Sequence, residues 1–289
     1  MKPESEPRER SCEVVATRSG IPAILHRASG EVMHPGTGPA VEARELYVLP
    51  SRLEERLVAG SAMAGAGPLV LFDVGLGAAS NAIGAWRVSE SLPASARRLE
   101  IVSFDHDLDA LKLALEPAHA EAFGLTSDAH AAATTLLTTG RHETPRTTWR
   151  LAFGDFLEAL AREPEASGDI VFWDMFTRGA NPHLWTVSAF EALRRACRAG
   201  ATLHTYTTAT SARSGLLLAG FAVGVGGRTG DREQTTIAAT GREHLANPLD
   251  ARWLTRLARS TAAFPTDIPD NADAHAEALA KVRAHPQFA

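Results

Sequence analysis

The chain has few of the features that mark secreted, metal-binding or membrane proteins. Its 289 residues include two cysteines, Cys12 and Cys197, which form neither a disulfide framework nor a metal-ligand pattern. We expect Cys197 to be a small buried side chain in a helical run. The sequence contains no apolar run of about 18 residues, and the charged residues 1–11 lack the apolar centre of a signal peptide. These absences predict a cytoplasmic protein that binds neither a metal nor a membrane.

An excess of positive charge is also absent. The net charge of −5 and the isoelectric point near 6.1 give no overall attraction to nucleic acid, so RNA binding would need a local basic patch. The hydrophobic content of 45% is enough for a full core. The length fits one large domain, or one domain with additions.

The most informative stretch of the sequence is residues 68–81. Four consecutive apolar residues predict a buried strand, Asp73 ends it, and Gly75 and Gly77 turn the chain into a helix. A strand that ends in an acid and runs through Gly-x-Gly into a helix is how an α/β sheet presents a nucleotide-like ligand at its carboxyl edge. The glycines allow the backbone to approach that ligand closely.

The type of ligand depends on the residues around these glycines. Ser80 stands where a dinucleotide fingerprint has its third glycine, whereas Asp73, two residues before Gly75, fits the pattern of S-adenosylmethionine (SAM) sites. Glycines also close plain turns, so this stretch alone leaves a ligand loop and a simple turn open.

The rest of the pattern predicts the fold class. Strands that alternate with helices imply right-handed crossovers and a mainly parallel sheet. The last two strands are joined by a linker too short for a helix, so they should form an antiparallel hairpin, as in SAM methyltransferases. The predicted strands are 69–73, 99–104, 148–153, 169–173, 200–206, 221–226 and 233–239, and the predicted helices are 78–90, 108–116, 155–163, 185–198 and 209–219.

The segments on either side of this pattern look like additions to one domain. We expect a disordered N-terminus over 1–12, an N-terminal β arm and helix over 13–62, the Rossmann-like domain over 63–240, and a helical C-terminal extension over 241–289. The further predicted strands are 13–17, 22–26, 30–35 and 45–48, and the further helices are 51–62 with Ser51 as N-cap, 118–123 and 128–137 in an insertion, 251–262 and 272–284.

Acids follow the second and third strands of the sheet. Asp105 can accept hydrogen bonds from both ribose hydroxyls of a nucleoside, although Asp107 or Asp109 could instead simply cap the next helix, and both can hold at once. Asp155 can accept a hydrogen bond from an adenine amino group while Phe156 packs on the ring. Asp155 is also a good N-cap for its own helix, which is the simpler interpretation.

Asp174 ends the fourth strand, beyond the point where the strand order reverses, so it should face the reacting methyl group. It could bind an acceptor ammonium, take its proton and orient the nitrogen lone pair. The alternative is that Asp174 only caps the turn over 181–185. Tyr206, at the end of the fifth strand, should line the same pocket or be a buried aromatic, and His204 should be a core histidine.

Taken together, these stretches resemble the SAM-dependent methyltransferase domain of the tRNA 5-methylaminomethyl-2-thiouridine biosynthesis protein and its MnmC-like relatives. The resemblance covers about 40–240, and its most specific part is an Asp-x-Phe segment followed by Asn-Pro-x-x-Trp. The matching residues are Glu42, Arg44, Gly75, Gly77, Asn81, Asp174, Phe176, Asn181, Pro182, Trp185, Thr207, Thr208, Ala209, Arg213, Gly215, Leu216, Ala219, Gly220, Phe221, Arg232 and Glu233.

The resemblance implies an enzyme that uses SAM to methylate the aminomethyl group of the tRNA wobble uridine in a bacterium, with Asp174 beside the acceptor amine. We expect the cofactor-binding residues to be Asp73, Gly75, Gly77, Asn81, Asp105, Asp155 and Phe156. We expect the substrate-binding residues to be Phe176, Asn181, Trp185, Tyr206 and Arg232. A basic surface for tRNA would draw on Arg178, Arg213, Arg228 and Arg232.

Departures from the family pattern keep other functions open. The family glycine between Asp and Phe is Met175 here, and Thr177, Arg178 and Ala180 replace small and basic residues where the acceptor should bind. The alternatives are a small-molecule amine methyltransferase or a spermidine-synthase-like aminopropyltransferase, whose acceptor site would use paired acids. A non-catalytic SAM-binding protein fits less well, because the glycines and acids are intact. The sequence does not indicate the oligomeric state.

Overall fold

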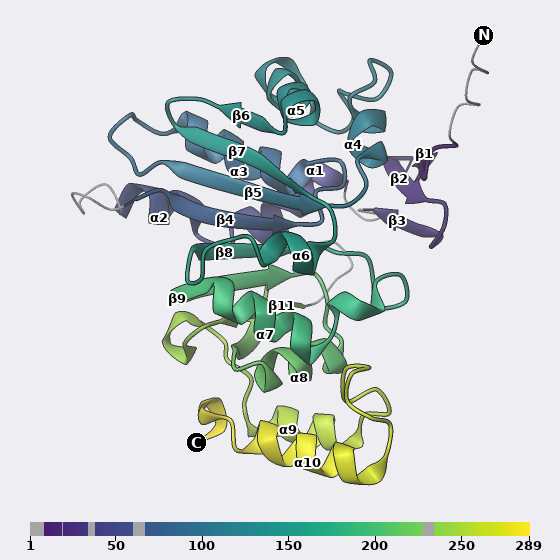
Figure 1. The fold of residues 1–289 in the computed structure, drawn as a ribbon, viewed down its shortest axis with the longest axis vertical. Helices are drawn as coiled ribbons and strands as arrows, with labels where there is room; N and C mark the ends of the chain where they lie inside the picture. The colour runs from purple at the N-terminus through teal and green to yellow at the C-terminus, as the bar shows by residue number, and fades with distance from the viewer. Residues whose placement is uncertain (1–8, 19, 34–37, 60–66, 228–233) are drawn as a thin grey trace.

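The computed structural model describes residues 9–18, 20–33, 38–59, 67–227 and 234–289 (Figure 1). The N-terminal β arm is a separate antiparallel sheet in the order β1-β2-β3 (Cys12–Ala16, Pro22–His26, Glu31–Met33). It lies beside α4 (Asp109–Ala114), and the Ser11 backbone N–H donates to the Asp109 carboxylate at 3.1 Å. The predicted arm is therefore present, and Ser11 connects its start to α4.

The main sheet has eight strands in the order β10-β11-β9-β8-β4-β5-β7-β6. The five central strands run parallel, while β11 pairs antiparallel with both β10 and β9. The prediction of a mainly parallel sheet that ends in an antiparallel hairpin is confirmed. The strands are β4 (Leu69–Val74), β5 (Leu99–Asp105), β6 (Arg141–Glu143), β7 (Thr147–Phe153), β8 (Gly168–Trp173), β9 (Cys197–Thr205), β10 (Ala222–Gly226) and β11 (Thr235–Ala239).

Helices cover both faces of this sheet, as the crossovers require. They are α1 (Pro39–Glu42), the π-helical η1 (Ala43–Val48), α2 (Leu53–Ala59), α3 (Ser80–Ser91), α4, α5 (Ser127–Thr139), α6 (Phe156–Leu160), α7 (Val187–Ala196), α8 (Thr210–Leu218), α9 (Ala251–Arg259) and α10 (Ala272–Arg283). Three short 3₁₀ turns complete the described elements: η3 (Pro182–Leu184), η4 (Arg242–His244) and η5 (Pro286–Phe288).

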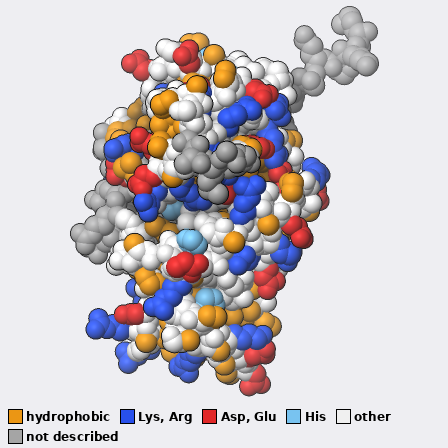
Figure 2. All heavy atoms as spheres, turned by 90° about the vertical axis from the view of Figure 1, so that its left-hand side faces the viewer, with side chains coloured by type: hydrophobic (Ala, Val, Ile, Leu, Met, Phe, Trp, Pro, Cys, Tyr) orange, Lys and Arg blue, Asp and Glu red, His pale blue; other side chains and the backbone are white. Residues whose placement is uncertain are grey.

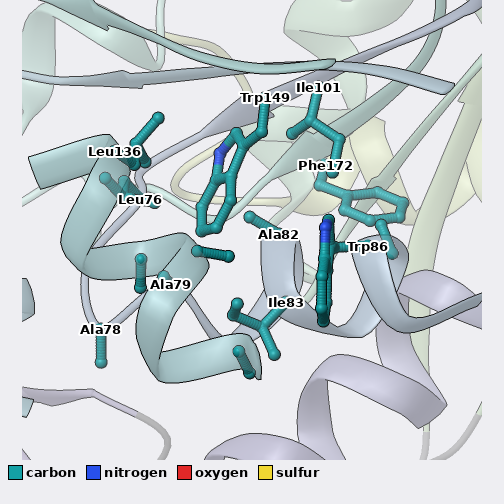
Figure 3. Packing of buried hydrophobic residues seen from close by; sticks show 14 of the residues in the cluster. Leu76, Ala78, Ala79, Ala82, Ile83, Trp86, Ile101, Leu136, Trp149 and Phe172 are labelled. Carbon is teal, nitrogen blue, oxygen red and sulfur yellow. The ribbon is translucent and has the colours of Figure 1, made fainter. Parts of the chain in front are cut away.

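The packing of α3 shows how the helical period builds this core. The positions of Ala79, Ala82, Ile83 and Trp86 follow the helical spacing i, i+3, i+4 and i+7, so their side chains share one face. All four are buried (Figure 3). They belong to one buried cluster with Trp149 of β7 and with apolar residues of β4, β5 and β8. Every residue of β4 and of β8 is buried, as expected for central parallel strands.

The predicted strand at 45–48 is wrong. These residues form the end of η1, and Leu46, Tyr47 and Val48 are all buried. A strand would point successive side chains to opposite faces, whereas the wider turn of η1 lets three neighbours pack inward, next to α3. Ser51 is not the N-cap of α2, because that helix begins at Leu53 and the Ser51 hydroxyl donates to the Val48 carbonyl at 2.8 Å.

Two other boundaries differ from the prediction. Residues 117–124 form turns rather than a helix, since Pro117 opens the segment and Gly124, with φ of +70°, closes it. Cys197 begins β9 instead of continuing a helix, although its side chain is buried as expected. Burial raises the pKa of its thiol to about 12.

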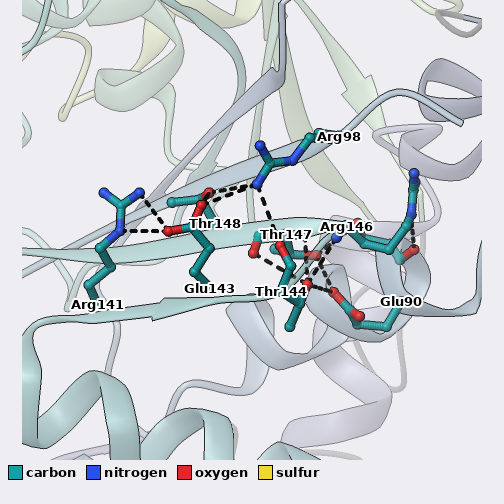
Figure 4. A network of polar contacts seen from close by, with 9 residues as sticks. Glu90, Arg98, Arg141, Glu143, Thr144, Arg146, Thr147 and Thr148 are labelled. Atoms are coloured by element: carbon teal, nitrogen blue, oxygen red, sulfur yellow. Dashed lines mark hydrogen bonds and ion pairs between the residues drawn. The ribbon is translucent and has the colours of Figure 1, made fainter. Parts of the chain in front are cut away.

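The sequence pattern missed the edge strand β6, which forms a hairpin with β7 (Figure 4). Arg146, in the turn, is 8% exposed and donates to the carbonyls of Ser89, Ala96 and Arg97. The Thr144 and Thr147 hydroxyls each lie 2.6 Å from the Glu90 carboxylate. These contacts join the hairpin to the end of α3 and to the loop between α3 and β5.

The C-terminal extension is joined to the edge strand β10. Gln287 in η5 is 3% exposed, and its amide nitrogen donates to the carbonyls of Val223 and Leu249 at 2.7 and 2.9 Å. Its amide oxygen accepts a hydrogen bond from the Val223 N–H at 2.7 Å. One side chain thus links β10 to residues 247–249, whose backbone also bridges to β10, while α10 packs against α8.

Replacing Gln287 with alanine should lower the free energy of unfolding by about 2–4 kcal/mol. The Val223 N–H and the Leu249 carbonyl lose their hydrogen bonds with this side chain, while the Val223 carbonyl keeps the one from the Leu249 N–H. Urea denaturation followed by circular dichroism measures this change. The exposed Gln234 is the matched control, and its replacement by alanine should change stability by less than about 0.5 kcal/mol. Equal, small effects of both variants would show that the clamp does not stabilise the fold.

Candidate functional site

The turn after β4 lies directly against the end of β8. Gly75 has a φ of +94°, and a Cβ at this position would lie 2.7 Å from the Asp174 carbonyl oxygen. No other residue fits this contact without a backbone shift. The Asp174 N–H in turn donates to the Val74 carbonyl at 2.9 Å. The Gly-x-Gly segment therefore brings the glycine loop and Asp174 together at one edge of the sheet.

Asp105 organises the same edge from β5. Its carboxylate accepts hydrogen bonds from the backbone N–H groups of Gly77, His106 and Asp107 at 3.0, 2.8 and 3.1 Å. Burial raises the pKa of Asp105, while the hydrogen bonds from Asp107 and Gly77 lower it in part. The Asp107 carboxylate accepts from the Asp109 N–H at the start of α4, so Asp107 supports the helix while Asp105 stays at the loop.

Three adjoining hollows open at this edge. The central cavity, of about 320 Å³, lies between the glycine loop, β8 and the arm. The edge pocket, of about 210 Å³, includes Asp155 and Phe156. The arm pocket, of about 510 Å³, lies under the N-terminal β arm. Asp105, His106 and Asn181 line all three.

Asp174 is held at the central cavity by two donors. The Tyr47 hydroxyl donates to one carboxylate oxygen at 2.6 Å, and the Asn81 side-chain amide donates to the other at 2.8 Å. Tyr47 is fully buried and Asn81 is 3% exposed, so both donors are fixed by packing. These contacts, rather than capping of the 181–185 turn, account for the orientation of Asp174.

Asp73 does not reach any of these hollows. Strand β4 continues to Val74, so Asp73 lies inside the strand, and its fully buried side chain accepts a hydrogen bond from the Ser103 hydroxyl at 2.6 Å. Burial raises the pKa of Asp73 to about 7, although the Ser103 hydrogen bond opposes the shift. The expectation that its side chain contacts the cofactor directly is therefore corrected.

The other predicted residues fall into distinct positions. Gly75, Gly77, Asn81, Phe176, Asn181 and Tyr206 line the central cavity. Trp185 lies behind it, where its indole N–H donates to the Phe176 carbonyl at 2.8 Å. Asp155 caps α6 through the Leu157 and Glu158 N–H groups, so the N-cap interpretation is confirmed. It also lines the edge pocket with Phe156, and its contact with adenine stays a prediction.

One of the four arginines predicted for a basic surface belongs to the core instead. Arg213 is 2% exposed and donates to the Thr236 hydroxyl and the Thr235 carbonyl, so it is a core residue. Arg178 is exposed, and it donates to the Ser211 hydroxyl. Arg228 and Arg232 lie outside the described residues.

Several lining residues were missed by the sequence analysis as site residues. Glu42 and Leu46 come from the helical segment before the main sheet, and Glu31 and Met33 come from the arm. The match of Glu42 to the family pattern was the only signal for this group. The carboxylates of Glu31, Glu42, Asp105 and Asp174 line the central cavity, and no lysine or arginine is among its described lining residues.

The lining also contains buried polar atoms that lack a hydrogen-bond partner. Within the described part of the chain these include the Ser80 hydroxyl, the Asn81 amide oxygen and the Asn181 amide nitrogen. A buried polar group without a partner is costly, so such atoms indicate where a ligand binds. SAM carries an ammonium, a carboxylate, a sulfonium and ribose hydroxyls, and the carboxylates and free polar atoms present here fit that set.

Two findings concern metals and membranes. No group of three histidine, cysteine, aspartate or glutamate side chains that could hold a metal ion occurs among the residues the structure describes. Likewise, no helix within the described ranges combines the length and the apolar character that crossing a membrane requires.

Comparison with known proteins shows what this chain is similar to. Residues 124–241 match the family model described as S-adenosyl-L-methionine-dependent methyltransferase. The tRNA 5-methylaminomethyl-2-thiouridine biosynthesis bifunctional protein MnmC of Methylibium petroleiphilum is 30% identical over 239 residues, which are 81% of this chain and 35% of the relative. The MnmC protein of Ectopseudomonas mendocina is 33% identical over 209 residues, 69% of this chain and 30% of the relative. This chain thus spans about a third of these relatives.

Solved structures support the fold. MNMC2 from Aquifex aeolicus aligns with a TM-score of 0.68 at 23% identity, covering 96% of this chain and 86% of that one. Spermidine synthase from Thermotoga maritima aligns with a TM-score of 0.52 at 11% identity, covering 95% and 82%. The resemblance inferred from the sequence is confirmed, and the sheet is that of SAM-dependent methyltransferases.

Asp105 provides a test of the cofactor site. Asp105→Asn should weaken binding of S-adenosylhomocysteine by more than about 1.5 kcal/mol, because it removes a charged acceptor for the ribose and mismatches the three N–H donors of the loop. Isothermal titration calorimetry measures the affinity. Asp109→Asn, which changes a carboxylate on α4 that lines none of the three hollows, should leave it unchanged. An unaltered affinity in Asp105→Asn would place the ribose elsewhere.

Proposed function

We propose that this chain, a member of the S-adenosyl-L-methionine-dependent methyltransferases, transfers the methyl group of SAM to an amine. The observation that carries the proposal is the fixed Asp174 carboxylate at the central cavity, held by Tyr47 and Asn81. We further infer that the amine is the aminomethyl group of a tRNA wobble uridine, as the names of the relatives suggest.

The charge of the central cavity favours a cationic acceptor. Its four lining carboxylates attract the ammonium form of an amine and oppose an anionic group such as a phosphate. A tRNA would therefore insert only its modified base and amine arm, while its backbone stays outside. This arrangement explains how an acidic active site can serve a nucleic-acid substrate.

In this proposal, Asp174 acts on the acceptor nitrogen. It binds the ammonium, accepts or relays one proton, and leaves the nitrogen lone pair free. Bound SAM supplies a methyl group on a positively charged sulfur. With SAM bound, methyl transfer would form the N–C bond and break the S–C bond, and the S–C electron pair would stay on sulfur. Since Tyr47 and Asn81 use both oxygens of Asp174, the carboxylate keeps one orientation throughout.

A spermidine-synthase-like transfer is the second candidate, and one observation favours it. The sequence offered one acid in the loop after β8, but Glu42 and Glu31 add two more carboxylates to the same cavity from other elements. Paired acids suit a diamine acceptor. The match of residues 124–241 to a methyltransferase family supports methyl transfer instead.

The surface that would bind the tRNA backbone lies outside the central cavity. Figure 2 shows one face on which arginine and lysine side chains gather beside acidic ones. At the amino-terminal end of β8, Arg97 and Arg198 pair with Asp169 at 3.6 and 2.9 Å, so these cations are already engaged. Arg178 is a described cation near the rim of the site, and we infer that it contacts the tRNA backbone.

Incubating the protein with methyl-labelled SAM and several acceptors tests the function directly. Label should enter tRNA that carries the unmethylated aminomethyl group, and the binding of this tRNA should fall steeply with salt because counterions are released. Label in small amines alone would favour the small-molecule enzyme. Aminopropyl transfer from decarboxylated SAM, with no methyl transfer, would overturn the proposal.

Replacing Asp174 with asparagine keeps the shape and removes the charge. Turnover should fall by roughly 10² or more, the range for a lost acid–base group. The deficit should shrink as the pH rises toward the pKa of the acceptor amine, since solvent then removes the proton. Binding of S-adenosylhomocysteine should barely change. Near-full activity at neutral pH would rule out the general-base role.

Replacing Tyr47 with phenylalanine removes one donor to Asp174 and keeps the ring. The carboxylate then loses a hydrogen bond that stabilises its charged form, so the acidic limb of the pH–rate profile should move to higher pH. Steady-state rates across pH measure the limb. The control is Val48→Ala, which alters the packing of η1 without touching Asp174, and which should lower stability while leaving the limb in place.

A further inference from the structure

The C-terminal extension contains a helix whose exposed face is basic. Helix α9 has three arginines, Arg252, Arg256 and Arg259, and no aspartate or glutamate. Their spacing of four and three residues puts the three side chains on one face, and all of them are exposed, whereas Trp253 and Leu257 on another face are buried. In Figure 2, basic side chains stand out at the lower end of the molecule, which the C-terminal extension forms in Figure 1.

The positive charge of α9 is not neutralised within the described part of the chain. None of its three arginines forms an ion pair there, whereas Lys281 and Glu277 on the neighbouring α10 pair with each other at 2.8 Å. Burial and, to a smaller extent, the nearby charge of Arg256 lower the pKa of Arg213 on α8 to about 10. Arg213 itself donates only to neutral oxygen atoms among the described residues. Like charges that lie close together in this way favour the binding of an anion.

These charges continue toward the acceptor site. Helix α8 carries both Arg213 and Ser211, and the Ser211 hydroxyl accepts a hydrogen bond from the exposed Arg178 at 3.0 Å. Arg178 lies in the loop after β8, four residues beyond Asp174. Helix α8 therefore connects a cation at the rim of the site with the cations of α9. Basic groups at several points along a surface suit a long polyanion better than a single small anion.

From this arrangement we propose that the exposed face of α9 binds the phosphate groups of an RNA strand outside the central cavity. The inference rests on the proposed function for the identity of the RNA, and it gives the C-terminal extension a role as a second contact site. Arginine binds phosphate through its charge and its paired N–H donors. The acidic lining of the central cavity repels the same phosphates. Helix α9 lies beyond residue 241, where the match to the methyltransferase family model ends.

The test removes the charge of this face without altering the hollows at the sheet edge, because no α9 residue lines any of the three. One triple variant combines Arg252→Gln, Arg256→Gln and Arg259→Gln, and a second variant has lysine at the same positions. Binding of a full-length tRNA transcript without modified bases is measured by fluorescence anisotropy at several salt concentrations. Methyl transfer to the free nucleoside 5-aminomethyluridine is measured alongside, because this acceptor has no phosphate backbone.

The matched control loses the same charge elsewhere on the surface. It combines Arg52→Gln, Arg141→Gln and Arg162→Gln, which are exposed arginines on other elements of the chain. Substitutions at exposed positions change stability by less than about 0.5 kcal/mol each, so all variants should fold. Thermal melting followed by circular dichroism checks that they do.

We expect the glutamine variant of α9 to raise the dissociation constant for tRNA roughly tenfold or more. The slope of log affinity against log salt should become less steep by about 2, since each lost phosphate contact removes about 0.7–0.9 from it. The lysine variant should keep most of the affinity, because it keeps the charge. The control variant should bind tRNA as the unaltered protein does, and every variant should keep the same KM for the free nucleoside.

Unchanged tRNA affinity in the glutamine variant would overturn the inference, as would an equal loss in the control variant. If sedimentation shows that the α9 variant changes only the oligomeric state, the face binds a second copy of this chain instead. If labelled methyl groups enter tRNA and all variants bind it equally, the inference fails and the proposed function stands. If the α9 variant loses tRNA binding but no amine is methylated by any form of the protein, the proposed function fails and the α9 assignment stands.

Discussion

The contact between the glycine loop after β4 and the backbone at Asp174 is the constraint on which the site depends. Adjacent parallel strands place their carboxyl ends side by side, but only a residue without a Cβ allows the two loops to touch. This contact sets the distance from the cofactor loop to the proposed base. Asp105 then fixes the other side of the loop through the Gly77 N–H, so one short segment is held from both neighbouring strands.

What the sequence predicted well are the features that local chemistry determines. Apolar runs and linker lengths predicted the strand ends and the final hairpin. The topology of parallel sheets predicted that Asp105, Asp155 and Asp174 lie at one edge of the sheet. Asp73 was misplaced because the strand runs to Val74, one residue further than the predicted end, so Asp73 is an interior residue of the strand with a buried side chain. When the end of a strand moves by one residue, a residue expected at the edge of the sheet becomes an interior residue of the strand.

The residues that the sequence could not place act across long separations. Tyr47 lies 127 positions from Asp174, and its role depends on how η1 packs over α3. Nothing in residues 43–48 signals the π-helical turn, since the apolar side chains there fit a strand equally well. The arm pocket likewise exists only because Glu31 meets the loop after β8, a contact between segments 146 positions apart.

The acidic lining of the central cavity affects the end of the reaction as well as its start. The cofactor enters with a positively charged sulfur and leaves as a neutral thioether. Four carboxylates therefore attract the spent cofactor less than the fresh one, by an amount set by their distance from sulfur and the local dielectric. We therefore expect the carboxylates that attract the reactants to bind the spent cofactor less strongly than the fresh one, which would favour its exchange.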